Sequence, residues 1–134
     1  MGRISGLAEV VLLVQDLQKS VAFYRDTLGL RVISPRDFPA AFLRVGDERD
    51  GVPQQIVLVP RPAEARAGAT SKLERDVHHI GLEVPAGQLE TERSRLSQLG
   101  FAIRGGEHPF LPVEAFYLDD PDGNEIEIVA ARVG

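Results

Sequence analysis

The chain of 134 residues contains no cysteine. This absence excludes disulfides, thiol nucleophiles and thiolate metal ligands. The formal net charge of −5 argues against a nucleic-acid partner, because binding a phosphate backbone requires a basic surface. The apolar runs are far shorter than the ~20 residues of a membrane span, and no signal-peptide pattern is present. We therefore expect a soluble, cytoplasmic protein that binds neither nucleic acid nor membrane.

Two common catalytic patterns are also missing. No glycine-rich phosphate loop follows a strand, since the pair Gly105 and Gly106 lacks both a third glycine and a following helix. No serine lies in a nucleophile-elbow pattern. The candidate chemistry must come from other side chains.

The chain does contain an internal repeat, with an offset of about seventy residues. The matching sets are Val10, Leu12 and Val14 with Ile80, Leu82 and Val84; Ile56 to Leu58 with Ile126 to Ile128; and Leu28 to Leu30 with Leu99 to Phe101. Either half alone would be marginally stable, because a short chain buries too little surface. We expect the two halves to fold as a unit or to exchange elements with a partner chain.

Each half predicts one strand, one helix and then three strands. Module 1, about residues 6–60, has expected strands at 7–14, 31–34, 40–45 and 54–59. Its helix begins after the capping residue Asp16, presents Leu17, Val21, Tyr24 and Leu28 on one face, and ends at Gly29. Module 2, residues 77–131, has a helix at 87–99 and expected strands at 78–84, 101–104, 114–118 and 125–130, with Gly105 and Gly106 in a loop.

The predicted fold class is α+β. Two tandem βαβββ modules form curved mixed sheets within a single domain of residues 1–134, with the helices on the convex face. Side by side, the modules would make a curved eight-stranded sheet. Residues 61–76 are rich in alanine, proline and charged residues and are interpreted as a linker between the modules.

Strand alternation then predicts which polar side chains share a face. If Ile80, Leu82 and Val84 lie under the helix, His79 points to the opposite, concave face. The same alternation sends Glu127 and Glu9 inward from the last strand of module 2 and the first strand of module 1. One imidazole and two carboxylates that converge on a cavity suit a divalent metal ion.

Simpler explanations stand beside this one. A histidine next to a strand is more often hydrogen-bonded than metal-bound, Glu9 could be solvated, and Glu127 could form an ion pair with His79. His78 alternates the other way and is interpreted as structural. His108 lies in a loop and is interpreted as a surface histidine rather than a general base.

The sequence resembles the vicinal oxygen chelate superfamily, which includes glyoxalase I, bleomycin- and fosfomycin-resistance proteins, methylmalonyl-CoA epimerase and extradiol ring-cleavage dioxygenases. The segments that carry the resemblance are 14–24, 28–30, 79–84 and Asp120-Pro121-Asp122-Gly123-Asn124 with the strand to Ile128. The resemblance implies paired glyoxalase-like βαβββ modules, a cavity in each curved sheet and a homodimer.

The resemblance also implies metal ligands from the first and last strands of the modules. Position by position, these are Glu9, His79 and Glu127, whereas the fourth position holds Val57. Val57 argues against a four-ligand site like that of glyoxalase I. Glu9 replaces a histidine or glutamine, which argues against the two-histidine, one-carboxylate set of non-haem iron and makes an extradiol-type dioxygenase less expected. The set favours manganese, zinc, magnesium or nickel over iron.

The leading hypothesis is a metal-dependent enzyme of lyase, isomerase or epimerase type that acts on a small molecule with neighbouring oxygens. Glu9, His79 and Glu127 would hold the metal, and Glu127 or Glu9 would move a proton. Glu83 and Gln55 are further candidates for the cavity lining. The alternative is a metal-free drug- or metabolite-binding resistance protein, because Val11, Leu13, Val57 and Val59 give module 1 an apolar wall. A regulatory or inactive paralogue is a third reading.

Overall fold

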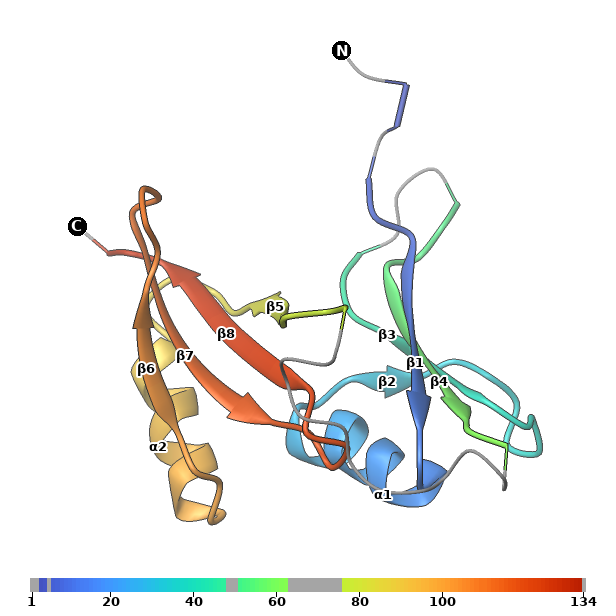
Figure 1. The fold of residues 1–134 in the computed structure, drawn as a ribbon. Helices are drawn as coiled ribbons and strands as arrows, with labels where there is room; N and C mark the ends of the chain where they lie inside the picture. The colour runs from blue at the N-terminus through green and yellow to red at the C-terminus, as the bar shows by residue number, and fades with distance from the viewer. Residues whose placement is uncertain (1–2, 5, 48–50, 63–75, 134) are drawn as a thin grey trace. The chain divides into compact units, whose positions relative to one another are not determined.

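The structure is a computed structural model that describes residues 3–4, 6–47, 51–62 and 76–133 (Figure 1). The chain divides into two compact units, Met1–Ala67 and Gly68–Gly134. Most of the predicted linker, residues 63–75, lies outside the described residues.

Unit 1 contains one mixed four-stranded sheet in the order β1-β4-β3-β2. Its elements are β1 (Glu9–Val14), α1 (Leu17–Val21), the π-helical segment η1 (Ala22–Thr27), β2 (Arg31–Val32), β3 (Ala41–Arg44) and β4 (Gln55–Pro60). β1 runs parallel to β4, whereas β3 is antiparallel to both β4 and β2.

Unit 2 repeats this topology with a sheet in the order β5-β8-β7-β6. Its elements are β5 (Ile80–Glu83), α2 (Leu89–Gln98), β6 (Arg104–Glu107), β7 (Val113–Asp119) and β8 (Glu125–Ala131). The predicted α+β fold of two βαβββ modules is confirmed. The strands of the described residues form two four-stranded sheets, however, and not the expected eight-stranded one.

One predicted strand is wrong. The sequence placed a strand at 101–104 and a loop at Gly105 and Gly106, but β6 begins at Arg104 and includes both glycines. Glycine is disfavoured in strands when judged by propensity alone. Here the glycines are accommodated because Gly106 pairs with Ala115 of β7 and faces the Tyr117 ring, where a larger side chain would not fit.

The repeat extends to the register of the strands. In unit 1, Val10 is paired with Ile56, and in unit 2, Ile80 is paired with Ile126. Both pairs join the first strand of a module to its last strand. Val10 and Ile80 are seventy residues apart in the sequence, and so are Ile56 and Ile126. The two halves therefore share the same parallel pairing and present the same alternation of faces.

The helix of module 1 differs from its predicted form. It begins as expected, with the Asp16 side chain accepting a hydrogen bond from the amide of Lys19 at 3.1 Å. From Ala22 onward it continues as a π-helix, in which the amide of Leu28 donates to the carbonyl of Phe23, five residues earlier. The buried residues of this segment are Ser20, Phe23 and Tyr24, so of the predicted stripe only Tyr24 is fully buried.

Each core lies between a helix and one face of its sheet. In Figure 1, α2 lies across the sheet of unit 2, where it contacts β7 and β8. The most deeply buried strand residues are aliphatic or aromatic: Val14, Leu43, Ile56, Leu58, Phe116, Leu118 and Ile126. Within the described residues, no helix is long and apolar enough to span a membrane.

The turn between β7 and β8 is held by Asp120, which is only 5% exposed. Its carboxylate accepts hydrogen bonds from the amides of Asp122 at 2.9 Å and Asn124 at 2.8 Å, and from the Asn124 side chain at 2.9 Å. This turn closes the hairpin and fixes the register of the two strands that carry the polar residues described below.

We predict that Asp120→Ala lowers the free energy of unfolding by about 2–4 kcal/mol, because it removes three hydrogen bonds to a charged, buried acceptor. Urea denaturation would measure the loss. Asp37→Ala, at an exposed turn position, is the matched control and should change the value by less than about 0.5 kcal/mol. Equal effects of the two substitutions would contradict the role assigned to Asp120.

Candidate functional site

The sheet of unit 2 has one face against α2 and one polar face. On the polar face the register aligns Arg104, Tyr117, Glu127 and Gly81 in a single row across the four strands. Residues in register share a face, so these side chains are neighbours. Asp119 and Glu125 form the next row. His79 immediately precedes β5 beside them.

Glu127 is at the centre of this face, and its side chain is 14% exposed. Its Oε2 accepts a hydrogen bond from the Tyr117 hydroxyl at 2.9 Å. Its Oε1 lies 3.6 Å from Nε2 of His79. The His79 ring also packs edge-on against the Tyr117 ring, with centroids 5.7 Å apart. The structure thus brings together His79 and Glu127, the two predicted ligands from module 2.

Tyr117 fixes the orientation of this carboxylate. Burial raises the pKa of the Tyr117 phenol, and the hydrogen bond to Glu127 and the negative charges of Glu127 and Glu125 raise it further. The phenol therefore remains protonated at neutral pH and acts as a donor. Because Oε2 is used by this hydrogen bond, Oε1 is the oxygen directed towards His79.

Two glycines leave space for these side chains. A Cβ at Gly81 would lie 2.9 Å from Oε1 of Glu127, and one at Gly106 would overlap the edge of the Tyr117 ring. A larger residue at either position would displace the group that it meets. The absence of side chains at these two positions is therefore part of the geometry of the site.

Arg104 supplies the positive charge on this face. Its guanidinium contacts Asp119 Oδ1 at 2.6 Å and Glu125 Oε2 at 3.0 Å. The hydrogen bond to Asp119 is the main reason that the pKa of Arg104 is raised. One fixed cation thus compensates two carboxylates and orients Glu125.

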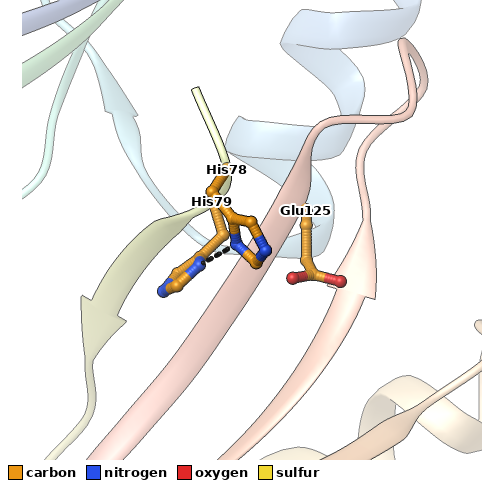
Figure 2. Close-up of side chains that lie close together, drawn as sticks. All are labelled: His78, His79 and Glu125. Atoms are coloured by element: carbon orange, nitrogen blue, oxygen red, sulfur yellow. Dashed lines mark hydrogen bonds between the residues drawn. The ribbon is translucent and has the colours of Figure 1, made fainter. Parts of the chain in front are cut away.

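A second cluster contains His78, His79 and Glu125 (Figure 2). Nδ1 of His78 and Nδ1 of His79 lie 2.8 Å apart. One potential ligand atom from each of the three residues lies within 4.8 Å of the others. This cluster shares only His79 with the predicted set of ligands. It also includes His78, which the sequence analysis had interpreted as a structural residue.

Unit 1 has an apolar row at the equivalent position of its sheet. The row equivalent to Gly81, Glu127 and Tyr117 is Val11, Val57 and Phe42. A pocket of about 230 Å³ lies at its Phe42 end and is lined by Ile33, Ser34, Pro35, Phe38 and Phe42.

Glu9, the third predicted ligand, is the first residue of β1 in unit 1 and is exposed. Its Oε2 accepts a hydrogen bond from Nε2 of Gln55 at 3.2 Å. Whether it joins His79 and Glu127 at one metal ion stays a prediction.

His108, interpreted as an ordinary surface residue, accepts hydrogen bonds from the amides of Phe110 and Leu111 and so stabilises its own loop.

Sequence reasoning missed Tyr117 and Arg104. A usable signal existed for Tyr117: a hairpin closed by Asp119 and Glu125 sets Tyr117 opposite Glu127. For Arg104 no such signal existed, because the strand was predicted at 101–104 and the structure has it at Arg104–Glu107. Sequence reasoning also gave no role to Glu125, which lies two residues before Glu127 on the same face of β8.

The comparisons with known proteins agree with this architecture. The Glyoxalase/Bleomycin resistance protein/Dioxygenase superfamily matches residues 6–128. The chain belongs to this superfamily.

Three curated relatives carry different names. The chain is 32% identical to catechol-2,3-dioxygenase of Bacillus subtilis. The match covers 90% of this chain but only 40% of the length of that relative. It is 31% identical to glutathione transferase FosA of Serratia marcescens, covering 97% of this chain and 86% of the relative. It is 25% identical to lactoylglutathione lyase of Neisseria meningitidis, covering 96% of this chain and 92% of the relative. These relatives are named as enzymes, but they do not share one reaction.

Among solved structures, the chain is similar to a glyoxalase/dioxygenase from Nostoc punctiforme. The TM-score is 0.73 at 21% identity, with 97% of this chain and 93% of that chain covered. This likeness supports the fold.

We predict that Gly81→Ala weakens binding of a divalent metal ion at least tenfold, because the new methyl group displaces Oε1 of Glu127. Isothermal titration calorimetry with MnCl₂ would measure the change. Gly105→Ala is the matched control, since a Cβ at that position meets no atom within 4 Å. Unchanged affinity in Gly81→Ala would show that Oε1 of Glu127 is not a ligand.

We also predict that Tyr117 titrates above the ordinary tyrosine pKa of about 10. Because this pKa is raised in the folded state, the neutral phenol stabilises the fold below about pH 10, and the contribution is lost as the pH rises through the folded-state pKa. The chain has two tyrosines, so the difference in tyrosinate absorbance between the wild type and Tyr117→Phe isolates this titration. A midpoint at or below 10 would contradict the assigned environment.

Proposed function

We propose that the protein is a small-molecule enzyme of this superfamily that binds a divalent metal ion through Glu9, His79 and Glu127. The reaction is of lyase, isomerase or epimerase type on a substrate with neighbouring oxygens. The supporting observation is the separation of 3.6 Å between Nε2 of His79 and Oε1 of Glu127.

This separation is longer than a hydrogen bond and is compatible both with an ion pair and with two ligands of one ion. It exceeds the usual 2.7–3.2 Å of an N–H···O bond. Two donors that each lie about 2.0–2.2 Å from one ion are roughly 2.9–4.3 Å apart, depending on the angle between them. Imidazole nitrogen and carboxylate oxygen are both suitable donors for zinc, and the carboxylates suit manganese and magnesium. The residues present therefore fit a divalent ion.

A bound divalent ion would supply Lewis-acid polarisation of substrate oxygens. The residues around it have separate tasks in the proposal. Tyr117 holds the Glu127 carboxylate through its hydroxyl, as second-shell groups commonly orient a ligand. Gly81 keeps space beside Oε1. Glu127 or Glu9 accepts and returns the proton that the rearrangement of the substrate requires.

A second candidate is a metal-free binding protein for a drug or metabolite. The apolar pocket at Phe42 and Phe38 favours it, since a small apolar group would be buried there. Its volume of about 230 Å³ is below the ~300–1,000 Å³ typical of drug-sized sites, so it suits only part of such a ligand. An extradiol-type dioxygenase ranks lower because Glu9 occupies the first-strand position. A homodimer and a cytoplasmic location remain predictions from the sequence.

Metal analysis separates the two candidates. We predict that protein purified without chelators carries a divalent ion at this site, and that the metal content falls by at least one ion per chain in His79→Ala and in Glu127→Gln, because each substitution removes a proposed ligand. Glu9→Gln should weaken binding at least tenfold. Inductively coupled plasma mass spectrometry would give the content, and Glu114→Gln, an exposed glutamate of β7, is the matched control.

Activity would then be assayed in three reactions suggested by the names of the relatives: formation of lactoylglutathione, transfer of glutathione, and cleavage of catechol. Activity that disappears on metal removal and in Glu127→Gln supports the enzyme. A metal-free protein that retains a bound small molecule would favour the binding protein instead.

A further inference from the structure

We propose that His78, His79 and Glu125 form a second divalent-cation site, built entirely from unit 2. This site is distinct from the set of Glu9, His79 and Glu127. It supplies two imidazole nitrogens and one carboxylate oxygen, a combination that suits zinc, nickel or copper.

The first support is the spacing of the two rings. Nδ1 of His78 and Nδ1 of His79 lie 2.8 Å apart. Two nitrogens bound at about 2.0–2.1 Å to one ion are roughly 2.8–3.4 Å apart when the angle at the metal is between 90° and tetrahedral. The two Nδ1 atoms share a hydrogen bond whose length is also at the lower end of this range, so an ion would replace the shared proton without moving the rings far apart.

The second support is the carboxylate that lies beside the rings (Figure 2). Its ligand atom lies within 4.8 Å of those of the two histidines. Two ligands on opposite sides of an ion are about 4.0–4.4 Å apart. The bound of 4.8 Å is only slightly wider than this span, so the proposal requires the donors to move closer together by a few tenths of an ångström.

Arg104 supports this carboxylate. The Glu125 side chain is only 14% exposed, and its Oε2 contacts the guanidinium at 3.0 Å. Arg104 is itself held by Asp119 at 2.6 Å. Ligating carboxylates are commonly oriented by such outer hydrogen bonds. The exposure of His78 and His79 leaves the nitrogen side of the cluster open to an ion from solvent.

His79 belongs to both sets but uses a different ring nitrogen in each. Nε2 faces Glu127, and Nδ1 faces His78. The two sets also differ in chemistry, since one is rich in oxygen and the other in nitrogen. Nitrogen-rich sets follow the Irving–Williams order most strongly, so zinc and nickel should select the second site, whereas manganese should prefer the first.

Calorimetric titration of the metal-free full chain with ZnCl₂ and with MnCl₂ tests this inference. We expect His78→Ala and Glu125→Gln each to weaken zinc binding at least tenfold while manganese binding changes less than about threefold. Glu127→Gln should weaken manganese binding at least tenfold and change zinc binding less than about threefold. His108→Ala, which alters the third histidine of the chain, is the control, and thermal unfolding of each metal-free variant checks that the fold is intact.

The outcomes distinguish this site from the proposed enzyme site. Zinc binding lost in His78→Ala but kept in Glu127→Gln supports the second site, even if no manganese binds. Zinc binding lost in Glu127→Gln but kept in His78→Ala overturns the second site and leaves the proposed function standing. Absence of zinc binding in the wild type, or its loss in all of these variants, also overturns a separate site. A shift of the Nδ1 nuclear magnetic resonances of His78 and His79 on adding zinc is the direct signature expected.

Discussion

The parallel pairing of the first and last strands within each module is the constraint on which the rest depends. β1 pairs with β4 and β5 with β8, in equivalent registers. A parallel pair requires a crossover connection, which carries the helix to one face of the sheet. That face becomes the core, and the other is left for polar or ligand-binding residues. In unit 2 the same register sets Glu127 beside Gly81, which has no side chain to obstruct the carboxylate.

Duplication of this framework allowed its two copies to diverge in chemistry. The row of Val11, Val57 and Phe42 in unit 1 is apolar, whereas the equivalent row in unit 2 holds Gly81, Glu127 and Tyr117. The order and direction of the strands are the same in the two units, although the ladders differ in length, because backbone pairing does not depend on the identity of the side chains. Side chains on the exposed face can therefore change without loss of the fold.

The polar face of unit 2 is ordered by a small number of directed interactions. Tyr117 fixes one oxygen of Glu127, and Arg104 joins Asp119 to Glu125. Charge-assisted hydrogen bonds of this kind restrict side-chain rotation and hold carboxylates in place before any ligand arrives. His79 lies between the two groups, with one ring nitrogen towards Glu127 and the other towards His78.

The sequence alone determined the repeat, the order of elements and the faces on which His79 and Glu127 lie, because strand alternation and the apolar stripe are local properties of the chain. Tertiary structure decided the rest. It placed Gly105 and Gly106 in a strand, continued the first helix as a π-helix from Ala22, and set Tyr117 against Glu127 and His78 against His79. These features depend on contacts between strands or on close packing at one point, and such contacts join residues that have no regular spacing in the sequence.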